Sequence, residues 1–139
     1  MKQRFVWTDD QVRTALDLAP SEDRAVSFRS VTTDSRSTQE GDLFVALQGD
    51  RFDGHDYVSD ALHRGARGAV VSRRVELAEE TSIYEVEDTL RALGHLAGHR
   101  RAHLDAAVVG ITGSSGKTST KDLTRAALEG TRRLHATWG

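Results

Sequence analysis

The residues best suited to chemistry lie in the stretch "VVGITGSSGKTSTKDL", residues 108–123. Gly113 and Gly116 allow a tight turn, so that successive backbone N–H groups can point at one anion. Lys117 can reach a phosphate oxygen, and the Thr118 hydroxyl beside it can hold Mg²⁺. A helix that follows at once adds positive potential at its N-terminus. This spacing predicts a loop that binds nucleotide phosphates.

The stretch departs from the general phosphate-loop pattern at one position. The pattern G-x-x-x-x-G-K-[ST] requires glycine at 111, but Ile111 stands there and the upstream glycine is Gly110. A glycine-serine turn that happens to precede a helix is the alternative. The apolar strand expected at Ala106–Thr112 and the helix expected at Thr118–Leu128 favour the phosphate loop, because that loop needs both.

The elements upstream alternate between strand-like and helix-like patterns. β-rich segments predict strands near residues 29–35, 43–47, 69–72 and 82–86, with a helix near 57–64. The alternation predicts an α/β fold. Residues 1–86 are expected to form one compact domain, residues 87–104 a connecting helix, and residues 105–139 the start of a second, nucleotide-binding domain.

The longest helical pattern runs from Asp88 to Leu104. An apolar face is expected on it, made of Leu90, Leu93, Ala97 and Leu104. His95, His99 and His103 are spaced four apart and form a row on the helix. Such rows can bind metal, but no acidic or cysteine partner is evident, so a solvated polar face is the favoured interpretation.

The composition excludes several classes of protein. The chain has 139 residues, a net charge of −2 and no cysteine. Nothing in the charge favours nucleic acid or an anionic membrane as partner, and a disulfide framework is excluded. No run approaches the roughly 20 apolar residues that span a bilayer. The expectation is a soluble, cytoplasmic protein.

The motifs together resemble the Mur ligase family. "GITGSSGKTSTKDL" is similar to the ATP loop of these enzymes, in which the leading glycine is not fixed. The stretch from 32 to 72 resembles their N-terminal domain, which binds the UDP-linked substrate. The motifs that carry the resemblance are Asp34-Ser35-Arg36, "GDLFVAL" at 41–47, Gly49 and Asp53-Gly54-His55.

The resemblance implies a role for each motif. ATP contacts are expected at Gly113, Ser114, Ser115, Gly116, Lys117, Thr118 and Ser119. Among these, Lys117 and Thr118 are the expected catalytic residues, with Thr118 as the Mg²⁺ ligand. Contacts to the UDP-linked substrate are expected at Ser35, Arg36, Asp53, Gly54 and His55.

Two of these UDP-substrate motifs keep a structural alternative. Asp34 and Arg36 can merely shape a turn and pair with each other, and His55 can simply cap one. Phe44 lies in an apolar strand, where a core position is favoured over a stacking platform.

Within the family, the loop most resembles that of the members that add D-alanyl-D-alanine to UDP-N-acetylmuramoyl-tripeptide, with ATP and Mg²⁺. Members that form the tripeptide are the alternative, as is a UDP-sugar-binding module without catalysis. An unrelated phosphotransferase does not explain "GDLFVAL" with "DGHD". The resemblance implies three domains in the full enzyme. The chain is therefore expected to be a fragment that is inactive alone and can self-associate.

Overall fold

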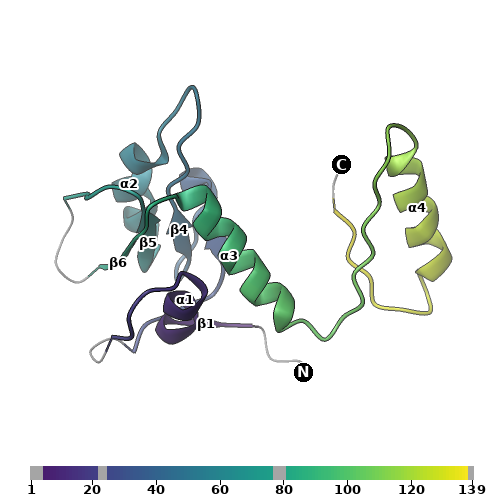
Figure 1. Cartoon of the computed structure of the whole chain (residues 1–139), viewed down its shortest axis with the longest axis horizontal. Coiled ribbons are helices and arrows are strands. Elements are labelled where there is room, and N and C mark those ends of the chain that lie inside the picture. Colours follow the sequence, from purple (N-terminus) through teal and green to yellow (C-terminus); the bar gives the residue numbers. More distant parts are fainter. Residues whose placement is uncertain (1–4, 22–24, 77–80, 138–139) are drawn as a thin grey trace. The chain divides into compact units, whose positions relative to one another are not determined.

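The fold is described from a computed structural model, which covers residues 5–21, 25–76 and 81–137 (Figure 1). The chain divides into two compact units, Met1–Leu104 and Asp105–Gly139. The helix expected to connect two domains therefore belongs to the first unit. In chain order the elements are β1 (Trp7–Thr8), α1 (Asp9–Ala15), β2 (Ser27–Phe28), β3 (Val31–Thr32), the 3₁₀ helix η1 (Ser35–Ser37), β4 (Leu43–Val45), the 3₁₀ helix η2 (Gly54–Tyr57), α2 (Val58–His63), β5 (Gly68–Val71), β6 (Ser82–Glu85), α3 (Thr89–Ala102) and α4 (Lys117–Leu128).

The first unit is built on a four-stranded parallel sheet in the order β3-β4-β5-β6. This confirms the α/β prediction and three of the four expected strands. The expected strand at 29–35 is wrong in extent. Ser27–Phe28 pairs instead with β1 in an antiparallel ribbon, and the parallel strand β3 ends at Thr32. The chain turns there because the Asp34 carboxylate caps η1.

Side chains of the central strands alternate between two apolar clusters, one on each face of the sheet. Leu43, Val45 and Val70 pack with residues of α1, α3 and the antiparallel ribbon. Phe44, Ala69 and Val71 pack on the other face, with Val58 and Ala61 of α2. This alternation follows from the two-residue repeat of a strand. Phe44 is 1% exposed, which confirms its predicted core position.

Helix α1 is joined to the sheet by a buried hydrogen bond. Thr8 caps the helix and forms a capping box with Gln11. The Tyr84 hydroxyl of β6 donates to the Asp9 carboxylate over 2.6 Å. Arg13 donates to the second oxygen of this carboxylate over 2.7 Å. Both oxygens of the buried Asp9 side chain therefore have a partner, as burial of a charge requires.

The inward face of α3 differs from the expected one. Thr89, Ala92 and Leu96 are buried, whereas Leu90 is 67% exposed. The start of the helix fixes its rotation, because the Thr89 hydroxyl donates to the Ala46 carbonyl over 2.8 Å. The apolar face predicted at Leu90, Leu93, Ala97 and Leu104 is therefore wrong: the buried positions lie about one residue earlier in the sequence. Of these four, Leu93 packs against the core at its margin.

His99 continues this inward stripe, so the prediction of a solvated histidine row is wrong for it. Its ring lies 5.5 Å from the Trp7 ring and 4.4 Å from the His103 ring. The His99 Nε2 atom is buried and has no hydrogen-bond partner among the described residues. Burial lowers the pKa of His99, and the neighbouring His103 lowers it further. No group of three metal-binding side chains occurs in the described part of the chain.

The second unit contains α4, which confirms the helix expected at 118–128. The preceding segment 106–112 forms no strand in the described residues, so the strand expected there is wrong for this chain. Its side chains, such as Val108 and Val109, are exposed. No helix in the described residues is long and apolar enough to cross a membrane.

The Tyr84–Asp9 hydrogen bond predicts the effect of removing one hydroxyl. Tyr84→Phe is expected to lower the free energy of unfolding by about 2 kcal/mol, because the buried carboxylate loses a donor. Urea denaturation monitored by circular dichroism measures this change. Tyr57→Phe is the matched control, since that ring is 44% exposed. Equal stabilities of the two variants would contradict the assignment.

The half-buried His99, whose Nε2 atom is buried, predicts a loss of stability in weak acid. Its pKa is lowered in the folded state from the ordinary 6.5, so the unfolded chain takes up a proton first as the pH falls. The contribution of neutral His99 is complete above about pH 6.5 and declines below it. Urea midpoints measured between pH 7.5 and 5.5 should fall less steeply for His99→Gln than for wild type. An identical slope for the two proteins would reject this prediction, and His95→Gln serves as the exposed control.

Candidate functional site

The candidate substrate site lies at the carboxyl edge of the parallel sheet. Because β3, β4, β5 and β6 run in one direction, the segments that follow them begin at the same edge. Ser35 and Arg36 follow β3, and Asp53, Gly54 and His55 belong to the segment that follows β4. The structure thus places both predicted groups of UDP-substrate residues at one edge. In parallel sheets this edge is the usual place for a ligand.

The turn after β3 is held by Asp34 and Arg36. The Arg36 guanidinium donates twice to the Asp34 carboxylate, from Nε over 2.9 Å and from Nη2 over 2.8 Å. The Arg36 backbone N–H also donates to this carboxylate. The side-chain hydrogen bond from Arg36, with the backbone one, lowers the pKa of Asp34 to about 2. The structure thus shows the turn-shaping pair that was the alternative interpretation of Arg36.

Ser35 differs from its neighbour. Its hydroxyl is partly exposed and has no hydrogen-bond partner among the described residues. The Arg36 side chain is 85% exposed despite its pairing with Asp34. The turn therefore offers a free hydroxyl and an oriented guanidinium to a ligand.

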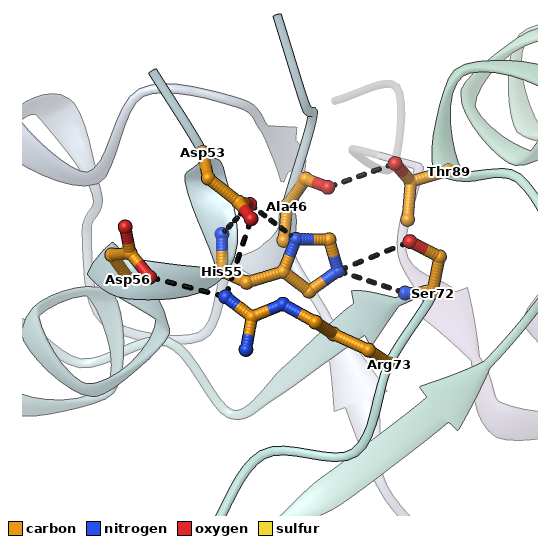
Figure 2. Close-up of polar contacts among 7 residues, drawn as sticks. All are labelled: Ala46, Asp53, His55, Asp56, Ser72, Arg73 and Thr89. Carbon is orange, nitrogen blue, oxygen red and sulfur yellow. Dashed lines mark hydrogen bonds and ion pairs between the residues drawn. The ribbon is translucent and has the colours of Figure 1, made fainter.

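The segment after β4 is fastened to the end of β5 by His55 (Figure 2). The Ser72 backbone N–H donates to His55 Nε2 over 2.9 Å. Since Nε2 accepts this bond, the ring proton of the neutral imidazole lies on Nδ1 and is donated to Asp53 over 2.5 Å. The Asp53 carboxylate also accepts from the His55 backbone N–H. The His55 side chain points inward and is 1% exposed, which argues against the contact expected between its imidazole and the UDP-linked substrate.

Arg73 completes this group of side chains. One of its terminal nitrogens, Nη2, donates to Asp53 over 3.2 Å and to Asp56 over 3.1 Å (Figure 2). The pKa of Asp53 is lowered to about 2, chiefly by the hydrogen bonds from the His55 backbone and ring, and in part by the one from Arg73. Asp53 is therefore ionised at neutral pH, and it orients the half-exposed guanidinium of Arg73.

Gly54 is required by the close approach of two backbone segments. A Cβ atom at this position would lie 2.7 Å from the Leu47 carbonyl oxygen and 2.8 Å from the Leu47 nitrogen. The Gly54 N–H in turn donates to the Leu47 carbonyl over 2.8 Å. Gly54 therefore has a backbone role, and it allows Asp53 and His55 to stand on either side of this contact.

The phosphate loop lies in the second unit. Gly116 adopts φ of +75°, which favours glycine, and α4 begins at the next residue. No side chain caps this helix, so its first N–H groups remain available to an anion. The Lys117 Nζ atom donates to the Gly113 carbonyl over 2.5 Å. Ser114, Ser115, Thr118 and Ser119 are exposed on the loop and the first turn.

Sequence reasoning missed Ser72 and Arg73. Both follow directly on the apolar run "GAVV" of β5. Polar residues at the carboxyl end of a buried parallel strand are candidates for a site because that edge is shared by all the strands. The same rule, applied to the predicted strand at 69–72, would have drawn attention to them.

Comparison with known proteins places these features in one family. Residues 27–101 match the profile of the Mur ligase family, catalytic domain. A UDP-N-acetylmuramoyl-tripeptide–D-alanyl-D-alanine ligase from Rickettsia prowazekii is 38% identical over 90% of this chain and 27% of its own length. The ligase of the same name from Escherichia coli is 46% identical over 74% of this chain and 22% of its own.

A solved structure gives the same result. The MurF ligase from Thermotoga maritima, crystallised in complex with ADP, aligns with a TM-score of 0.71 at 37% identity. The alignment covers 79% of this chain and 25% of that one. The chain thus spans about a quarter of the length of the relatives it matches. The family profile covers more than half of the chain, and we conclude that the chain belongs to the Mur ligase family.

Proposed function

We propose that the chain forms the substrate-binding part, and the phosphate loop, of an ATP-dependent ligase that joins D-alanyl-D-alanine to UDP-N-acetylmuramoyl-tripeptide. The observation that carries the proposal is that two features occur in one chain of this family. One is a group of polar side chains at the carboxyl edge of the parallel sheet. The other is a phosphate loop at the start of α4.

The UDP-linked substrate is proposed to bind at the carboxyl edge. Ser35 supplies a hydroxyl, and Arg36 supplies a guanidinium suited to a diphosphate oxygen. Asp53 and Gly54 fix the backbone beside them. His55 acts as a positioning residue, because both of its ring nitrogens are occupied by protein partners.

ATP is proposed to bind at Gly113–Ser119. The glycine-rich turn and the uncapped start of α4 fit the phosphates. Lys117 would exchange the Gly113 carbonyl for a phosphate oxygen. Nucleotide-bound Mg²⁺ would spread the charge of the phosphates. Thr118 fits this ion as one hydroxyl ligand, and no acidic or histidine cluster that would complete its coordination occurs in the described residues.

The chain alone is proposed to bind nucleotide without catalysing ligation, because the described residues do not complete a metal site. The Mur ligases that form the tripeptide remain the alternative. They would share the UDP-substrate edge, and the incoming amino acid would distinguish them. A stand-alone UDP-sugar-binding module would also bind uridine diphosphate.

The proposal predicts that the chain prefers uridine diphosphate to ATP in titration calorimetry. The contacts proposed for the uridine nucleotide lie within the first unit, whereas those proposed for ATP are confined to the phosphate loop. Lys117→Ala should weaken ATP binding about tenfold or more and leave uridine diphosphate unchanged. Lys121→Ala, one turn further along α4, is the matched control. Tight ATP binding without uridine diphosphate binding would reject the proposal.

Self-association is proposed for the second unit. Val109 is 71% and Leu123 72% exposed. Exposed apolar side chains such as these favour association. Sedimentation velocity should show a concentration-dependent dimer that Val109→Lys removes. A wild-type chain that stays monomeric at about 100 μM, well above the ~1 μM of a moderate complex, would exclude it.

A further inference from the structure

Phe52 is an exposed aromatic residue at the carboxyl edge of the sheet. It is 55% exposed, although burial of such a side chain would stabilise the fold by about 2 kcal/mol. The other aromatic residue considered for stacking, Phe44, lies in the core and cannot meet a ligand. Neither apolar cluster of the first unit includes Phe52.

The Phe52 ring is held on one side only. It belongs to the tight loop between β4 and η2, where the Gly49 N–H donates to the Phe52 carbonyl over 2.9 Å. Gln48 and Asp53 pair across the base of this loop. A Cβ atom at Gly49 would lie 3.5 Å from Cε1 of the Phe52 ring, so the ring lies against the loop backbone. The remainder of the ring faces solvent.

The loop that carries Phe52 is fixed at its base by the contacts of Asp53 and His55 (Figure 2). Asp53, the residue after Phe52, accepts hydrogen bonds from His55 and Arg73, and His55 accepts one from Ser72 at the end of β5 (Figure 2). The ring is therefore carried by a loop that is anchored to two strands of the sheet. An anchored aromatic ring loses little conformational entropy when a flat group stacks on it.

We propose that Phe52 is the platform on which the uracil ring of the substrate stacks. This assignment rests on the proposed function, which brings a uridine nucleotide to the same edge. Ser35 and Arg36 offer polar contacts, but neither provides an apolar surface for the face of a base. Phe52 supplies that surface, and stacking of bases on aromatic side chains is a general and substantial source of affinity.

The proposal predicts a specific pattern of affinities for uridine diphosphate and 5,6-dihydrouridine diphosphate. The second ligand keeps the polar edge of the base, but its saturated ring is not flat. On the full 139-residue chain, Phe52→Leu should weaken uridine diphosphate about tenfold, and Phe52→Tyr should retain wild-type affinity. Wild type should bind the dihydro ligand about tenfold more weakly, whereas Phe52→Leu should hardly distinguish the two ligands.

The controls separate the two levels of the proposal. Tyr57→Leu, which removes the other exposed ring of this segment, should bind both ligands as wild type does. Circular dichroism should show unchanged folding of each variant, since Phe52 lies outside the core. If wild type binds uridine diphosphate and Phe52→Leu binds it equally well, the platform is rejected and the proposed function stands. If the folded wild-type chain binds no uridine diphosphate, the proposed function fails and the platform fails with it.

Discussion

The parallel pairing of β3, β4, β5 and β6 is the constraint on which the candidate substrate site depends. It brings the ends of these strands to one edge, so residues distant in sequence become neighbours there. The His55 imidazole then joins two of the segments at this edge, with each ring nitrogen hydrogen-bonded to a different one. The sheet determines where the candidate substrate site lies, and the His55 imidazole fixes the segment after β4 to the end of β5.

The two candidate sites use different physical means to attract a ligand. At the sheet edge the charges are already paired, Arg36 with Asp34 and Arg73 with Asp53 and Asp56. Such pairs orient donors but leave little net charge. In the phosphate loop, attraction comes from backbone N–H groups and from Lys117. This difference suits the proposed uridine diphosphate at one site, where a single guanidinium meets the diphosphate, and the more highly charged triphosphate of the proposed ATP at the other.

Much of the fold could be predicted from the sequence, because apolar runs and helix caps are local signals. Thr8 and the strands near 43–47, 69–72 and 82–86 belong to this class. The rotation of α3 could not be predicted, since it depends on the bond from Thr89 to Ala46, 43 residues away. The antiparallel ribbon of Trp7 with Phe28 is likewise a long-range pairing. In the site, the spacing of motifs found the loops, but the inward turn of His55 depends on its partner Ser72.

The hydrogen bond from Lys117 to the Gly113 carbonyl has a consequence for energetics. The ammonium group already has an acceptor within its own turn. A phosphate bound as proposed would therefore replace one acceptor by another, and only the difference between the two would contribute to affinity. In return, the lysine side chain is already folded back over the loop, so less rotational freedom remains to be lost on binding. The hydrogen bond to Gly113 thus weakens the net attraction of Lys117 for a phosphate and also lowers the entropy that its side chain would lose on binding.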